Sequence, residues 1–204
     1  MYLEIAKMRP MAAYQALIQT VIPRPIAWVL SKNSGVGYNL APFSFFNAVS
    51  DNPPLVVVSV GTKPDGSYKD TRVNIEAHGE YVIHIAHQAI REPMIESSRT
   101  LPAEDSELET TGLGTVLFEG FSVPRLQDAR LALACERLDI REIGNGPHSL
   151  ILGEVKCIYV DDELTGRDAK GRLKIDPLKF DPVSRLGAND YSSLGEVTEF
   201  VRPP

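Results

Sequence analysis

The chain has 204 residues, of which 43% are hydrophobic, with a formal net charge of −6 and a pI near 5.3. This length and composition suit one globular domain over residues 1–204 that buries a real core. The acidic balance argues against a broad basic face for nucleic acid or for an anionic membrane surface.

The N-terminal segment and the cysteines bear on where the protein works. Residues 1–14 interleave charged residues with short apolar pieces, unlike the apolar core of a secretory signal. No stretch elsewhere approaches the roughly 20 apolar residues that cross a bilayer. We therefore expect a cytoplasmic protein without a membrane partner. Cys135 and Cys157 lie far apart in apolar runs, which favours buried free thiols over a disulfide.

Short β-type runs recur along the chain, each rich in Val, Ile, Leu or aromatic residues and bounded by turn residues. They cover residues 26–31, 55–60, 81–86, 115–123, 131–143 and 150–160. Helical signals are fewer and cover residues 71–78, 92–98 and 105–110. Several strands with few helices and no regular βαβ alternation favour a barrel. The predicted fold class is therefore mainly β, a β-barrel with a few peripheral helices.

Two turns between β-type runs are predicted from their glycines. Residues 144–147, Gly-Asn-Gly-Pro, join the last two runs into a long antiparallel hairpin. In its second run one face is expected to be buried, because apolar or small residues alternate with more polar ones. The residues expected on the buried face are Ile151, Gly153, Val155, Cys157 and Tyr159. Residues 35–37, Gly-Val-Gly, lack the third glycine of a dinucleotide fingerprint and indicate a hairpin turn.

Residues 39–47, NLAPFSFFN, mix three aromatic residues with small polar ones and form neither a clean helix nor a clean strand pattern. A planar ligand needs that mixture, because apolar side chains cover its faces and short polar groups meet its edge. An isoalloxazine ring has both kinds of edge. The alternative is a loop whose phenylalanines plug a barrel end.

A small anion site is indicated at Lys69, Asp70 and Thr71, where the first predicted helix begins. If Thr71 is the N-cap, free backbone N–H groups and the positive end of the helix dipole lie beside Lys69. This arrangement suits a phosphate monoester. The alternative is a plain capped surface helix, because Asp70 reduces the local positive charge.

Other chemistries find little support in the sequence. The four histidines, His78, His84, His87 and His148, lack the spacing of a metal site, so none is predicted. The sequence has no G-x-S-x-G elbow and no cysteine in an electropositive setting, which argues against a hydrolase.

For His148, Arg24 and residues 167–174, the sequence allows both a functional and a purely structural interpretation. His148 lies at the predicted hairpin, where it could donate to a flavin carbonyl or phosphate, or be an exposed turn residue. We interpret Arg24 and residues 167–174 as solvated loop charge, with a partner or a nucleotide phosphate as the alternative.

Taken together, these blocks resemble the flavin reductase-like, FMN-binding split-barrel family. The resemblance rests on residues 22–29, 39–47, 49–50, 53–54, 69–71 and 74–75 and continues through 79–82, 133–136, 146–148, 152–155 and 182–191. It covers nearly the whole chain. It implies a six-stranded Greek-key split barrel with peripheral helices, FMN at its mouth, and a homodimer whose interface helps to close the flavin site.

The resemblance also implies roles for individual residues. The residues expected along the isoalloxazine and ribityl chain are Asn39, Ala41, Pro42, Ser44, Phe45 and Asn47, with Ser59 on the neighbouring strand. Lys69 and Thr71 should hold the phosphate. His148, Arg185 and Tyr191 complete the expected cofactor-binding set, with supply across the dimer as one arrangement.

The expected function is that of an NAD(P)H:flavin oxidoreductase. It would pass hydride from NADH or NADPH to flavin and electrons on to an acceptor such as a partner monooxygenase. No side-chain nucleophile or acid is required, so no catalytic residue is assigned. Two alternatives stay open: a noncatalytic FMN-binding electron-carrier module, and an oxidase of the pyridoxamine phosphate type on a related barrel.

Overall fold

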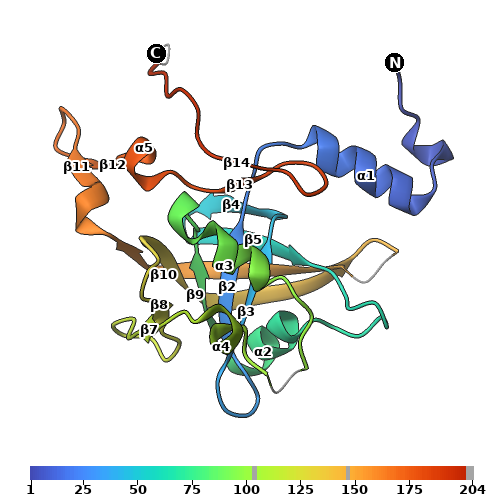
Figure 1. Cartoon of the computed structure of the whole chain (residues 1–204), viewed down its shortest axis with the longest axis horizontal. Helices are drawn as coiled ribbons and strands as arrows, with labels where there is room; N and C mark the ends of the chain where they lie inside the picture. The colour runs from blue at the N-terminus through green and yellow to red at the C-terminus, as the bar shows by residue number, and fades with distance from the viewer. Residues whose placement is uncertain (103–104, 146–147, 201–204) are drawn as a thin grey trace.

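The computed structural model describes residues 1–102, 105–145 and 148–200. Within them the main sheet has seven antiparallel strands in the order β3-β2-β6-β9-β10-β5-β4 (Figure 1). The strands are β2 (Ala27–Lys32), β3 (Tyr38–Phe43), β4 (Phe46–Asp51), β5 (Pro54–Val60), β6 (Glu80–His84), β9 (Leu131–Ile143) and β10 (His148–Val160).

The two edge strands of this sheet, β3 and β4, are consecutive in the chain and are separated by Ser44 and Phe45 alone. A two-residue connection can join opposite edges only if the sheet curls until they meet, so the sheet forms a barrel. The N–H of Ser59 on β5 donates to the Phe45 carbonyl (2.8 Å) and fixes this turn. The interruption at Ser44 and Phe45 also explains why seven strands are found where six were expected.

Apolar side chains form two cores, one on each face of β2. Inside the barrel, Val29 packs with Val58, Tyr81 and Ile151. Outside it, Trp28 and Leu30 pack with residues of the helices and of the C-terminal half. Because β2 is buried on both faces, its sequence is a continuous apolar run rather than an alternating one.

The helices lie around the barrel (Figure 1). They are α1 (Pro10–Thr20), α2 (Asp70–His78), α3 (Arg91–Glu96), α4 (Glu107–Thr111) and α5 (Pro177–Phe180), with 3₁₀ turns at Ile5–Lys7, Gln88–Ile90 and Asp162–Leu164. α2 lies against the barrel, whereas α1 and the N-terminal residues before it extend to one side.

Short strands complete the fold. β1 (Arg24–Pro25), β13 (Ser184–Arg185) and β14 (Tyr191–Ser192) form a small sheet. β7 (Thr115–Val116) pairs with β8 (Arg125–Leu126), and β11 (Thr165–Arg167) pairs with β12 (Leu173–Ile175). The small sheet brings the C-terminal residues 184–192 next to the start of the barrel.

The predicted barrel, its long hairpin and its helices are confirmed with small shifts in their ends. β9 pairs with β10 antiparallel, and the turn at residues 35–37 joins the paired strands β2 and β3. Gly146 and Pro147 of the predicted hairpin turn lie outside the described residues.

Three local predictions were wrong. Residues 115–123 form a strand only at Thr115–Val116. The apolar residues Phe118 and Val123, which suggested a longer strand, pack into the outer core without pairing in a sheet. Residues 39–47 belong to strands β3 and β4 on either side of a turn. Cys157 is exposed while Cys135 is buried. A register shift between Val155 and Cys157 breaks the expected alternation.

Candidate functional site

The residues expected to bind a cofactor line three adjoining cavities in the described part of the chain. The lysine cavity, about 400 Å³, contains Asn39, Ala41, Pro42, Lys69 and Thr71. The arginine cavity, about 240 Å³, contains Pro42, Ser44, Arg185 and Tyr191. The apolar cavity, about 630 Å³, contains Phe45, Ser59 and His148.

The cavities meet along the turn between β3 and β4. Pro42 and Ser98 line both the lysine and the arginine cavity, and Tyr14 lines both the arginine and the apolar cavity. Asn47 stands apart, because it is exposed on β4 and lines none of the three. Its side-chain oxygen accepts from the N–H of Ala48 (2.9 Å).

The lysine cavity is built on the N-terminus of α2. The predicted N-cap was wrong by two positions: α2 begins at Asp70, and Lys69 is the N-cap, with no side chain capping the end. Thr71 is unavailable as a cap because its Oγ1 accepts from Asn39 Nδ2 (2.8 Å), a buried contact that joins α2 to β3. The backbone N–H groups of the first turn, at Asp70 and Thr71, have no intrahelical acceptor.

Charge in the lysine cavity is unevenly paired. Lys63 Nζ lies 2.7 Å from Asp70 Oδ1, and Arg99 Nε lies 2.6 Å from Glu96 Oε1. Lys69 has no carboxylate within 4.0 Å in the part of the chain that the structure describes, and its Nζ lies 5.4 Å from the centre of the Phe43 ring. Lys69 is therefore the cation left to meet an anion at this helix end.

The surroundings of Lys69 change its acidity. The side chain keeps solvent access at the cavity rim, but protein atoms crowd its ammonium. This partial desolvation lowers the pKa of Lys69 below its ordinary value of 10.5. A bound anion would favour the charged form again.

Glu107 is a cavity residue that the sequence did not reveal. It lies in the first turn of α4, which Ser106 caps, and its Oε2 accepts from the N–H of Leu40 on β3 (2.9 Å). Burial raises the pKa of the Glu107 carboxyl. The other unforeseen wall residues are Thr62, Lys63, Pro64, Ser97, Ser98, Arg99, Thr100 and Leu101. Nothing in their spacing links them to β3, because the fold alone brings them there.

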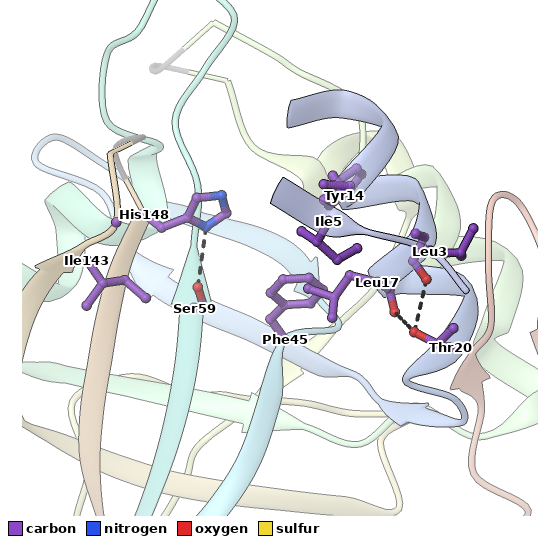
Figure 2. Close-up of a pocket in the computed structure, with 12 residues that line it drawn as sticks. Leu3, Ile5, Tyr14, Leu17, Thr20, Phe45, Ser59, Ile143 and His148 are labelled. Atoms are coloured by element: carbon purple, nitrogen blue, oxygen red, sulfur yellow. Dashed lines mark hydrogen bonds between the residues drawn. The ribbon is translucent and has the colours of Figure 1, made fainter. Parts of the chain in front are cut away.

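The apolar cavity lies between α1 and the barrel (Figure 2). Leu3, Ile5, Tyr14 and Leu17 face Phe45 across it, and the Tyr14 and Phe45 ring centres are 6.4 Å apart. The barrel side of the cavity also carries two polar side chains, next to Ile143. There Ser59 Oγ lies 3.4 Å from His148 Nδ1. The cavity thus has apolar faces and one polar edge, as a planar heterocycle requires.

The arginine cavity corrects the interpretation of Arg24 as solvated loop charge, because Arg24 is 6% exposed. Its Nη1 donates to the carbonyls of Ile18 (2.7 Å) and Val21 (2.6 Å), and its Nη2 donates to that of Leu186 (2.7 Å). Arg24 therefore ties the end of α1 to the C-terminal segment. Residues 167–174, by contrast, lie at the exposed hairpin of β11 and β12.

Two further properties were checked over the described residues. They contain no group of three or more His, Cys, Asp or Glu side chains placed to hold a metal ion. None of their helices combines the length and apolar character needed to span a membrane. The buried His84 serves the fold: it contacts the Trp28 carbonyl (3.1 Å) and accepts from the N–H of Leu126 (3.0 Å), and burial lowers its pKa to about 3.

Comparisons with known proteins find relatives that are similar over nearly the whole chain. A relative from Bacillus subtilis, the uncharacterized protein YwrF, is 40% identical over 194 residues, which is 93% of each chain. Component B of nitrilotriacetate monooxygenase from Bacillus cereus superposes with a TM-score of 0.90 at 32% identity, covering 98% of both chains.

A second solved structure is also similar over the full length. The 2-nitrobenzoate 2-nitroreductase NbaA of Pseudomonas fluorescens gives a TM-score of 0.87 at 28% identity, covering 100% of this chain and 96% of that one. The curled sheet is the split barrel of such structures. Residues 19–179 match the family model of the flavin reductase like domain. This range includes all the residues that line the lysine cavity and half of those that line the apolar cavity. The chain therefore belongs to the flavin reductase-like domain family.

Proposed function

We propose that this protein binds FMN and acts as an NAD(P)H-dependent flavin oxidoreductase, passing hydride from NADH or NADPH to flavin and electrons on to an acceptor. The observation that carries the proposal is Lys69, a cation without a carboxylate partner among the described residues. It stands at the uncapped N-terminus of α2. Free N–H groups, the positive end of a helix dipole and a lysine together suit a phosphate monoester.

The residues of the lysine and apolar cavities fit the parts of FMN. Lys69 and the first turn of α2 would hold the phosphate, and Asn39 would keep Thr71 in place for it. Phe45 and the apolar walls would cover the ring, whose polar edge would meet Ser59 and His148. Bound FMN would supply the hydride acceptance and electron delivery of the reaction. The chain would bind and orient the reactants and limit the access of water.

We further propose that the working form is a homodimer. α1 and the residues before it expose large apolar side chains to solvent, with Met11 68% and Leu17 49% exposed. Such a surface is typical of a face that another protein covers. Sedimentation velocity over a dilution series should show a dimer. Leu17→Asp should weaken it at least tenfold, by about 1.4 kcal/mol or more, whereas Gln15→Asp on the same helix should not.

The flavin reaction is tested by absorbance spectra of the purified protein with added FMN, recorded anaerobically before and after NADH or NADPH. The proposal expects flavin bands that the protein perturbs and that then bleach. Bound flavin that stays oxidised would favour the electron-carrier function, and absence of flavin binding would overturn both. Hydrogen peroxide formed from pyridoxamine phosphate would instead favour the oxidase.

The acceptor can be sought in the same anaerobic sample after reduction. Component B of a monooxygenase and a nitroreductase are both similar to this chain, which suggests two classes to add. Reoxidation by a nitroaromatic acid indicates a nitroreductase. Reoxidation by oxygen or free FMN alone indicates a reductase that serves another protein.

A further inference from the structure

We propose that the arginine cavity is an anion site, built by Arg24 and Arg185, for a phosphate or carboxylate group of the molecule that exchanges electrons with the flavin. The identity of that molecule rests on the proposed function. The existence of an anion site does not, because it follows from the charges and burial of this chain's own residues.

The position of the cavity suits a group at one end of a larger ligand. It adjoins the lysine cavity through Pro42 and Ser98 and the apolar cavity through Tyr14. Its volume of about 240 Å³ is below the roughly 300–1,000 Å³ of pockets that hold whole drug-sized ligands. A phosphate or carboxylate could sit there while the rest of its molecule reaches the apolar cavity.

Arg24 brings a buried positive charge that is only partly compensated. Its hydrogen-bond partners are three backbone carbonyls, all neutral, and its Nε–H has no acceptor in the described part of the chain. A buried guanidinium normally has a carboxylate or phosphate partner, because desolvating an unpaired charge is costly. No carboxylate of the described residues lies within 4.0 Å of it.

Arg185 brings a second positive charge to the same cavity. It donates to the Tyr191 hydroxyl and to the Ala188 carbonyl, and its guanidinium carbon lies 4.4 Å from the centre of the Tyr191 ring. It too is without a carboxylate partner among the described residues. Both guanidinium groups line one cavity, and like charges at short range repel each other. Burial first and the charge of Arg185 second accordingly lower the pKa of Arg24.

A purely structural role explains one arginine but not both. The three carbonyl contacts of Arg24 hold the end of α1 against the C-terminal segment. That clamp needs no second cation. A bound anion would compensate both charges, and Ser44 and Tyr14, which line the same cavity, carry hydroxyls that could serve as further donors.

Two molecules could supply the group: a nicotinamide dinucleotide through a phosphate, and an aromatic acceptor through a carboxylate. Guanidinium groups bind both kinds of oxyanion. The experiment therefore uses one probe of each kind, inorganic pyrophosphate and benzoate. It includes a readout that needs neither flavin nor turnover.

Thermal unfolding of the purified protein is measured with and without each probe. At least one probe should raise the Tm of the wild type, because a ligand that binds the native state stabilises it. Arg185→Gln should lose the benzoate shift and the part of the pyrophosphate shift that Lys69→Ala retains, because pyrophosphate can also bind in the lysine cavity. Arg185→Lys should keep part of both shifts. Arg91→Gln, which removes an exposed arginine outside the three cavities, should keep both shifts in full. No shift with either probe, or equal shifts in Arg185→Gln and wild type, would overturn the site.

The source of the anion is then read from kinetics of the FMN-loaded protein. If the site binds a phosphate of the dinucleotide, Arg185→Gln should raise the KM for NADH or NADPH about tenfold or more. If it binds the carboxylate of an acceptor, Arg185→Gln should raise the KM for that acceptor by the same factor and leave the KM for NADH and NADPH unchanged. Arg24→Lys serves as a second variant that keeps the positive charge but loses the planar set of guanidinium donors. A Tm response that depends on Arg185 without any flavin bleaching would leave the anion site standing and reject the reductase.

Discussion

The helices α1 and α2 both contribute to the candidate site, but the barrel holds them very differently. α2 buries Thr71, Arg72, Asn74 and Ile75. Its side chains bond to three strands: Thr71 to Asn39 on β3, Arg72 to Ser149 on β10, and Asn74 to Ser31 on β2. In α1, all of whose residues are described, Ile18 alone is buried.

This difference separates a preformed end of the site from an open one. The lysine cavity depends on α2, so its anion-binding groups are fixed within one chain before any ligand arrives. The apolar cavity depends on α1, whose few buried contacts predict low local stability. We therefore expect the ring end of the site to be completed by the ligand or by a second copy of the chain.

The largest expected effect tests the packing of the two helices. Ile75 is 1% exposed, so Ile75→Ala should lower the free energy of unfolding by about 2–5 kcal/mol. Leu17 is 49% exposed, so Leu17→Ala should change it by no more than about 0.5 kcal/mol. Urea unfolding at low protein concentration measures both. Equal losses would show that α1 is held as firmly as α2.

The second effect tests the preformed end through the phosphate. Lys69→Ala should raise the Kd for FMN about tenfold to a hundredfold, because it removes a charge-assisted contact. The affinity for riboflavin, which lacks the phosphate, should stay the same. Lys63→Ala is the matched control, since Lys63 lines the same cavity but is already paired with Asp70. Equal losses for FMN and riboflavin would contradict the phosphate role.

The third effect tests the open end, and its pattern should be the reverse. Phe45→Ala removes an aromatic wall of the apolar cavity and should weaken FMN and riboflavin by the same factor, about twofold to tenfold. Val49→Ala on the exposed face of β4 serves as the control. Fluorescence quenching titrations with both flavins measure this. A loss confined to FMN would place the ring elsewhere.

The smallest effect is a dependence of FMN affinity on pH. The pKa of Lys69 is lowered from 10.5, so this lysine loses its charge at a lower pH than an exposed one. FMN affinity should therefore fall a few-fold as the pH rises through that lowered pKa, while riboflavin shows no such term. Lys69→Arg, which stays charged, should abolish the dependence. An unchanged pH profile in that variant would assign the titration to another group.

The helix α2 illustrates how far local sequence predicts the site. Its approximate range and the anion site at its start were predicted from Lys69, Asp70 and Gly79, because the signals for a helix start and stop are local. The wrong N-cap came from Thr71, whose hydroxyl is a good cap by type. Its actual partner, Asn39, lies on a strand far away in the chain. A contact of that kind cannot be read from spacing.

Arg24 and Glu107 are two further residues whose surroundings the local sequence does not predict. Arg24 lies between two prolines and Glu107 lies in a polar stretch of the sequence, yet both charged residues are buried in the structure. Burial of a charge depends on which backbone carbonyls or N–H groups come near it. Arg24 has two acceptors close in the chain, but its third acceptor, Leu186, is 162 positions away. The N–H group that Glu107 accepts from belongs to Leu40, 67 positions away.

The sequence by itself determined that this protein is a mainly β barrel with a long hairpin, because strand alternation and turn residues act between near neighbours. Through blocks that resemble the flavin reductase-like family, it also predicted a set of cofactor-binding residues, all of which except Asn47 line the three cavities. The tertiary structure alone decided how those residues are distributed among the lysine, arginine and apolar cavities. Curling of the sheet brings β3, α2, residues 97–101 and Glu107 around the lysine cavity. The C-terminal residues Arg185 and Tyr191 line the arginine cavity together with Arg24. The physical reason is that such cavities are formed by contacts between distant segments, which no local pattern encodes.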